Sequence, residues 1–226
     1  MVQPFEVAWS DDAVQAVLDQ VRAYPWPPAP QVPDGWAYGC DGAYLRDLCE
    51  HWTERYDWRA AVADLNRFPQ FTARVEDFDL HFLHVVGEAG GKRPLLLTHG
   101  WPGSHYEFWG VIEKLAWPSR FGGRAEDAFD LVIPSLPGFG FSSRPARPIG
   151  QQTTARLFNT LMTQVLGYDR YRAQGGDWGA LVTSWLGLEH AQNVSAIHLN
   201  MMGFRPAGGP KSEEEVAWMT RQGAMM

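Results

Sequence analysis

The chain has 226 residues, 45% of them hydrophobic and 20% charged, which is typical of a soluble globular domain with one core. Its 19 basic and 26 acidic residues give a net charge of −7, so it lacks the basic surface that nucleic acid requires. No apolar run is long enough to span a membrane, and the first residues lack the basic and apolar regions of a signal peptide. We therefore expect a cytoplasmic protein whose two cysteines, Cys40 and Cys49, are reduced.

Residues 1–70 are expected to form helices joined by an extended connector. A helix over residues 7–24 is predicted because Ser10 is a good N-cap and apolar residues recur at helical spacing after it. The proline-rich residues 25–33 exclude a helix or a central strand. They could bind a proline-recognising module, although a strap packed on the surface fits the flanking helices better. Two more helices are predicted, over residues 44–56 and 60–66.

Residues 71–86 alternate between apolar and polar side chains in two halves that are broken at Asp77. This pattern predicts a β-hairpin. The side chains expected to face inward are those of Val75, Leu80, Phe82 and Leu83. His81 and His84 would face opposite sides of the strand, which argues against a shared metal, and we expect them at the surface.

The rest of the chain alternates between buried strands and helices. Strands are predicted over residues 93–98, 129–134, 171–174 and 194–199, and helices over residues 107–115, 153–166 and 179–188. This alternation predicts an α/β fold, with a parallel sheet and right-handed crossovers.

The segment Gly175-Gly176-Asp177-Trp178-Gly179 lies between a predicted strand and a predicted helix. A tight turn of this kind is typical of a nucleophile elbow, which holds one side chain at the positive end of a helix. An ionised carboxylate there can attack an electrophilic sp3 carbon and form an ester, which points to epoxide opening or halide displacement. Taken alone, the segment also fits a simple turn with a helix cap.

Several motifs occur together in one order along the chain. They are Trp9-Ser-Asp-Asp12, Tyr56-Asp-Trp-Arg59, Leu97-Thr-His-Gly-Trp-Pro-Gly-Ser104, Pro134-Ser-Leu-Pro-Gly-Phe-Gly-Phe-Ser142, Gln174-Gly-Gly-Asp-Trp-Gly179 and Ile197-His-Leu-Asn200. In this order the chain resembles the α/β-hydrolases of the epoxide hydrolase family, of the microsomal and juvenile-hormone type. The resemblance implies an N-terminal extension over residues 1–70, the first part of the hydrolase core over 71–205, and the start of a cap region over 206–226.

The resemblance also implies roles for individual residues. Asp177 would be the nucleophile, and the backbone N–H groups of Trp178 and Trp101 would form the oxyanion hole. His99 would be structural and not the catalytic base. The residues expected to line an apolar substrate pocket are Pro102, Phe108, Trp109 and Phe139. No metal and no organic cofactor is expected, because no cluster of histidines and cysteines has ligand spacing.

The late histidine base, its acid partner and the cap tyrosines of the family have no counterpart among these 226 residues. Three explanations remain open: an enzyme made of two polypeptides, a truncated product or fragment, or a half-fold that buries its open sheet edge in a second copy. The expected partners are a small apolar epoxide and either a second polypeptide with the missing parts or a second copy of the chain.

The function expected from the resemblance is the addition of water to an oxirane, which gives a vicinal diol through an ester on Asp177. A haloalkane dehalogenase would also use an aspartate followed by tryptophan, but that group usually carries asparagine where this chain has Trp101. The third possibility is a non-catalytic α/β-hydrolase fragment that keeps the elbow and lacks the base.

Overall fold

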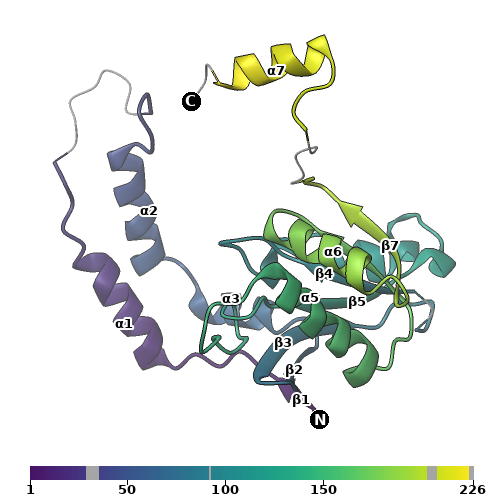
Figure 1. Ribbon diagram of the computed structural model, residues 1–226. Coiled ribbons are helices and arrows are strands. Elements are labelled where there is room, and N and C mark those ends of the chain that lie inside the picture. Colours follow the sequence, from purple (N-terminus) through teal and green to yellow (C-terminus); the bar gives the residue numbers. More distant parts are fainter. Residues whose placement is uncertain (29–35, 92, 203–207, 224–226) are drawn as a thin grey trace. The chain divides into compact units, whose positions relative to one another are not determined.

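The computed structural model describes residues 1–28, 36–91, 93–202 and 208–223 (Figure 1). It divides into two compact units, one of residues 2–72 and one of residues 73–226 together with Met1. Residues 29–33 of the predicted connector and residues 206–207 and 224–226 of the expected cap region lie outside the described residues. Among the described residues, no helix is long and apolar enough to cross a membrane. Cys40 and Cys49 are both free thiols.

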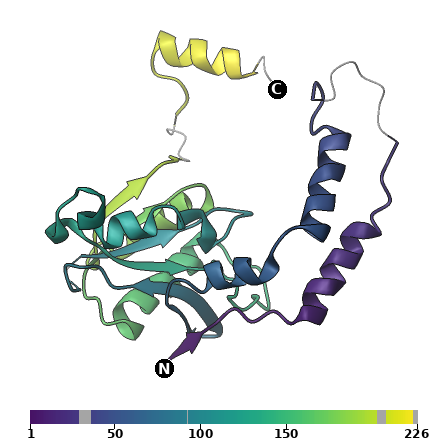
Figure 2. The ribbon, with the colours of Figure 1, turned by 180° about the vertical axis from the view of Figure 1, so that it is seen from behind.

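The described residues of the unit 2–72 form three helices, of which α1 and α2 lie side by side (Figures 1 and 2). Each helix begins where an oxygen-bearing side chain caps it: Ser10, Asp41 and Asp57 accept N–H groups of the first helical turn. The elements of this unit are β1 (Val2–Phe5), α1 (Asp11–Arg22), α2 (Gly42–Glu54), α3 (Trp58–Leu65) and the beginning of β2 (Gln70–Val75). The predicted cap at Ser10 is confirmed, but the helix after it is shorter than predicted and β1 was not predicted.

Asn66 fixes the start of the chain inside this unit. Its Oδ1 accepts the N–H of Val7 at 2.8 Å, and its Nδ2 donates to the carbonyl of Val7 at 2.9 Å. The two bonds satisfy both polar groups of a residue that is 2% exposed. One asparagine side chain therefore pairs with Val7 as a neighbouring strand would.

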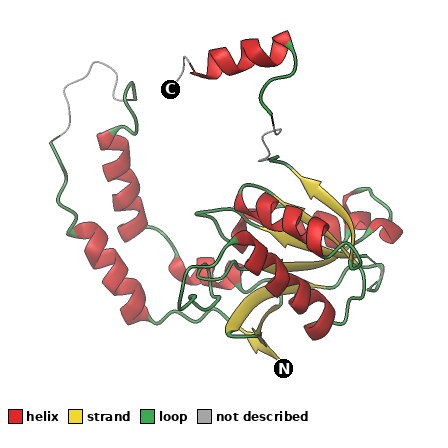
Figure 3. Cartoon of the chain, in the orientation of Figure 1, coloured by secondary structure: helices red, strands yellow, loops and turns green. Residues whose placement is uncertain are grey.

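The unit of residues 73–226 is built on a sheet, whose strands are the yellow arrows of Figure 3. Its neighbouring strands follow the order β3-β5-β4-β6-β7. Strand β4 pairs in parallel with β5 and β6, β6 pairs in parallel with β7, and β3 runs antiparallel to β5. The bounds are β3 (Phe78–Val85), β4 (Pro94–Thr98), β5 (Asp130–Pro134), β6 (Tyr171–Gly175) and β7 (Val194–Leu199). The predicted α/β fold with a mostly parallel sheet is confirmed.

The predicted break between β2 and β3 is also correct, because β2 ends at Val75 and β3 begins at Phe78. All four side chains expected to face inward are at most 1% exposed. His81 contradicts the expected surface position, since its side chain is fully buried. The error arose because its polar partners come from distant parts of the chain.

Two helices, α5 (Gln151–Thr160) and α6 (Trp178–Glu189), lie side by side on one face of the sheet (Figure 1). Helix α5 continues as a π-helical turn over Leu161–Val165. The single helix predicted over residues 107–115 is wrong: a 3-10 turn over His105–Phe108 and the short α4 (Ile112–Ala116) replace it. Glycine at position 110, between the two, disfavours a continuous helix. Two further 3-10 turns cover Pro118–Phe121 and Ala125–Asp127, and α7 covers Glu213–Gly223.

Candidate active site

Asp177 lies in a tight turn between the end of β6 and the start of α6. Its backbone has φ 51° and ψ −124°, a conformation that side-chain-bearing residues rarely adopt. The glycines on either side are required by close contacts. A Cβ at position 175 would lie 2.1 Å from the carbonyl oxygen of Gly179, and a Cβ at position 179 would lie 2.1 Å from the carbonyl oxygen of Thr98. The turn therefore presses α6 directly onto the end of β4.

Two backbone N–H groups bind the same oxygen of the Asp177 carboxylate. Trp101 donates to Oδ1 at 2.9 Å and Trp178 donates to Oδ1 at 2.6 Å. The Trp101 N–H, and to a smaller degree the Trp178 N–H, hold the pKa of the Asp177 carboxyl below its ordinary value. Within the part of the chain that the structure describes, Oδ2 has no hydrogen-bond partner, and the side chain is exposed. The site thus presents an ionised carboxylate with one held and one free oxygen.

The loop that follows β4 brings Trp101 to this position. Gly100 lies directly against the nucleophile candidate, because a Cβ there would be 3.0 Å from Asp177 Oδ1. The indole rings of Trp101 and Trp178 stack with centroids 6.4 Å apart, and both are about half exposed. Two aromatic rings therefore stand beside the carboxylate and give it an apolar flank.

The residues expected to line a substrate pocket are found in different places. Phe139 and Trp178 line one hollow of about 390 Å³ beside the elbow. Phe108 lines another hollow, of about 530 Å³, together with residues of β4, β6 and β7. Trp109 is buried in the core against His105 and Tyr106, and Pro102 is exposed next to Trp101. Of the four, the structure brings Phe139 together with an elbow residue in one hollow.

A buried polar cluster that the sequence did not reveal joins the loops around this site. Ser135 Oγ lies 2.9 Å from His81 Nδ1 and 3.3 Å from His105 Nδ1, and Ser142 Oγ accepts the N–H of His81. Burial lowers the pKa of His81 to about 3 and that of His105 to about 4, with a smaller contribution from a neighbouring histidine in each case. Both rings are therefore neutral at pH 7. Among the described residues, no group of three or more His, Cys, Asp or Glu side chains could hold a metal ion.

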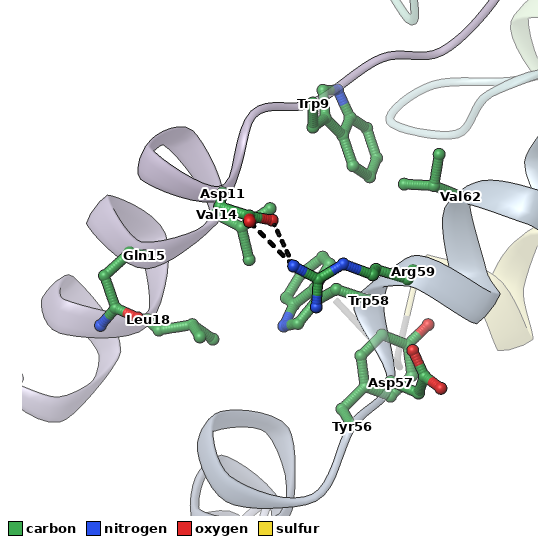
Figure 4. Close-up of a pocket in the computed structure, with 10 residues that line it drawn as sticks. All are labelled: Trp9, Asp11, Val14, Gln15, Leu18, Tyr56, Asp57, Trp58, Arg59 and Val62. Atoms are coloured by element: carbon green, nitrogen blue, oxygen red, sulfur yellow. Dashed lines mark hydrogen bonds and ion pairs between the residues drawn. The ribbon is translucent and has the colours of Figure 1, made fainter.

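A separate hollow of about 440 Å³ lies in the unit of residues 2–72, where two of the sequence motifs meet (Figure 4). Arg59 of α3 reaches toward α1 and pairs with both carboxylate oxygens of Asp11, at 2.9 and 2.8 Å. The rings of Trp9 and Tyr56 each meet Trp58 edge to face. Contacts between the motifs Trp9-Ser-Asp-Asp12 and Tyr56-Asp-Trp-Arg59 thus link α1 to α3. None of the predicted site residues lines this hollow.

Two family models match the chain. The one described as "Epoxide hydrolase N terminus" covers residues 2–108, and the one described as "alpha/beta hydrolase fold" covers residues 93–225. Epoxide hydrolase 1 of Oryctolagus cuniculus is 36% identical over 208 residues, which are 88% of this chain and 45% of the relative.

Two solved structures have a similar fold. The juvenile hormone epoxide hydrolase of the silkworm Bombyx mori matches with a TM-score of 0.80 and 31% identity, over 89% of this chain and 53% of that one. The Aspergillus niger epoxide hydrolase matches with a TM-score of 0.83 and 33% identity, over 99% of this chain and 58% of that one. The chain thus spans about half the length of the proteins that it matches.

Proposed function

From the premise that this chain belongs to the α/β-hydrolase fold family and matches relatives named epoxide hydrolase over 88% of its length, we propose that Asp177 is the nucleophile of an epoxide hydrolase. The observation that carries the proposal is the pair of N–H groups on Oδ1 of a carboxylate whose Oδ2 accepts no hydrogen bond from the residues that the structure describes. A carboxylate at a nucleophile elbow suits attack on a strained carbon–oxygen bond, since it needs no base to be deprotonated.

In the proposed reaction, Oδ2 of Asp177 attacks an oxirane carbon and the bond from that carbon to the epoxide oxygen breaks. The released alkoxide takes a proton from solvent, and an ester between Oδ2 and the former oxirane carbon remains on Asp177. Water then attacks Cγ, and the negative charge that develops on Oδ1 is stabilised by the N–H groups of Trp101 and Trp178, which already point at this oxygen. The bond between Cγ and Oδ2 breaks, and the diol leaves with the oxygen that was Oδ2, to which one proton of the water passes. The other proton returns to solvent, and the water oxygen stays in the carboxylate.

The first test asks whether Asp177 of the 226-residue chain reacts with styrene oxide, a small apolar epoxide. We expect peptide mass mapping to find one adduct with the mass of the epoxide on the peptide that contains Asp177. Asp177→Asn should remove this adduct, and Asp169→Asn, which changes an aspartate of the loop before β6, should keep it. Absence of the adduct from the unmodified chain would contradict the proposal.

The second test follows the complete enzyme through repeated turnovers in 18O-labelled water, in which label should accumulate in Asp177. A haloalkane dehalogenase would instead release halide from a chloroalkane and give no diol. The match to the epoxide hydrolase N terminus supports the epoxide reaction over that alternative.

The proposal includes a partner for β7, the strand at one edge of the sheet. Two mainly apolar hollows, of about 750 and 530 Å³, lie along β7 and share Ala196 and Ile197. We propose that further hydrolase core, which would also carry the cap and the histidine base, covers these hollows and pairs with β7. Native mass spectrometry of the protein purified from its own cell should detect this further hydrolase core together with the 25.4 kDa chain. A homodimer would contradict it.

The cytoplasmic location expected from the sequence belongs to the same proposal, and the two free cysteines support it.

A further inference from the structure

The peptide unit between Gly100 and Trp101 has both of its polar groups engaged. Its N–H donates to Asp177 Oδ1 at 2.9 Å, while its carbonyl oxygen accepts from the N–H of Gly103 at 3.0 Å and lies 2.8 Å from His99 Nδ1. A trans peptide unit is planar, with its C=O and N–H pointing in opposite directions. Whatever holds the oxygen therefore sets the direction of the N–H.

His99 is itself held in one orientation and one protonation state. Its Nε2 accepts the backbone N–H of Leu136 at 3.0 Å, so the ring proton must lie on Nδ1, from which it donates to the Gly100 carbonyl. The ring is fully buried and packs edge to face on Phe139. Burial lowers the pKa of His99, while the Gly100 carbonyl and the Glu107 carboxylate raise it to a smaller degree.

The ring thus joins two loops. Leu136 follows β5 and Gly100 follows β4, and each loop gives one backbone group to the same imidazole. The bond from Gly103 lies within a single turn of one loop and cannot supply this link. The Gly100 N–H adds a long contact of 3.4 Å to Glu107, again within one loop.

We propose that His99 is a positioning residue: its Nδ1–H holds the Gly100 carbonyl so that the Trp101 N–H points at Asp177 Oδ1. This role rests on the proposed function of the Trp101 N–H as an oxyanion donor. It assigns to His99 neither proton transfer nor contact with substrate. The tautomer is the essential feature, because a ring protonated on Nε2 alone could neither accept from Leu136 nor donate to Gly100.

The test compares two amide variants of the 226-residue chain. The amide of His99→Asn lies near the place of Nδ1 and can donate to Gly100, whereas the longer amide of His99→Gln lies near the place of Nε2 and can accept from Leu136. The readout is the pKa of Asp177 from carboxyl 13C NMR, because the Trp101 bond lowers it. We expect His99→Gln to raise this pKa and His99→Asn to keep it near the unmodified value. An unchanged pKa in both variants would overturn the proposal.

Urea unfolding of both variants separates positioning from folding, since a merely structural role would lower stability without moving the Asp177 pKa selectively. If neither variant folds, 15N NMR of the unmodified chain decides the question. A proton on Nδ1 of His99 supports the proposal, and a proton on Nε2 overturns it. The NMR and unfolding measurements use no epoxide. Failure of the chain to react with styrene oxide would therefore count against the proposed function alone.

Discussion

A Cβ atom added to Gly100 would lie 2.7 Å from the Cβ of Asp177. Real Cβ atoms do not approach one another so closely, so one of the two residues must move if position 100 carries a side chain. The contact is between the backbone of one loop and the side chain of the candidate nucleophile. A methyl group at position 100 should therefore displace the Asp177 side chain and lower its reactivity.

Gly100→Ala is expected to slow adduct formation at Asp177 at least tenfold, because it displaces a carboxylate whose position must be held closely for reaction. Gly110→Ala is the matched control, since a Cβ there meets nothing within 4 Å. The rate of adduct formation with styrene oxide, followed by intact-mass spectrometry, measures the effect. Equal rates for Gly100→Ala and the unmodified chain would show that the close contact has no role in reactivity.

Asp177→Gly is expected to stabilise the fold while abolishing the adduct. Asp177 has φ 51°, a strained conformation that costs on the order of 1–3 kcal/mol for a residue with a side chain and little for glycine. The extra entropy of glycine in the unfolded chain offsets about 0.4–1 kcal/mol of this gain. Urea unfolding should give a free energy about 1 kcal/mol higher than that of the unmodified chain. A lower value would mean that losing the two hydrogen bonds to the Asp177 carboxylate outweighs the relief of backbone strain.

The buried histidines predict loss of stability in mild acid. Burial lowers the pKa of His81 to about 3 and of His105 to about 4 in the folded chain, whereas an unfolded histidine titrates near 6.5. Below pH 6.5 the unfolded state therefore binds more protons, and stability falls progressively toward pH 3–4 and is full above 6.5. At pH 5 the loss is about 2 kcal/mol for each histidine.

Urea unfolding at pH 7.5 and pH 5 measures this loss. His105→Asn, which cannot be protonated, should reduce the difference between the two pH values by about 2 kcal/mol, whatever it does to stability at pH 7.5. If His105→Asn leaves the difference in free energy of unfolding unchanged, His105 is already protonated in the folded chain at pH 5.

Asn66→Ala is expected to lower the free energy of unfolding of the N-terminal unit by about 2–3 kcal/mol, because it leaves both polar groups of the buried Val7 without their partner. Hydrogen exchange of the Val7 amide gives a local check. Unchanged protection in Asn66→Ala would contradict the role of the side chain.

The features that the sequence predicted well depend on neighbouring residues. The cap at Ser10, the break after Val75 and the tight turn around Asp177 each follow from a few adjacent side chains whose backbone preferences agree. The α/β fold follows from the order of apolar runs, since a buried parallel strand is apolar along its whole length.

The features that it missed depend on residues far apart in the chain. His81 was expected at the surface because the strand pattern cannot show Ser135 and His105 beside it. Trp109 was expected in a pocket because its motif is near the site, yet the 3-10 turn directs it into the core. The held oxygen of Asp177 could be expected from family resemblance, whereas the ring of His99 behind it could not, because its partner Leu136 lies on another loop.

The position of β4 between β5 and β6 has a consequence for how the molecule acquires its reactive carboxylate. Strand β4 pairs with β6 across a long stretch of chain, and the Trp101–Asp177 bond spans 76 residues. Contacts of such sequence separation form slowly, because the intervening chain must be ordered first. The reactive site should therefore form late in folding, when β6 pairs with β4, because only then can the Trp101 N–H reach the Asp177 carboxylate.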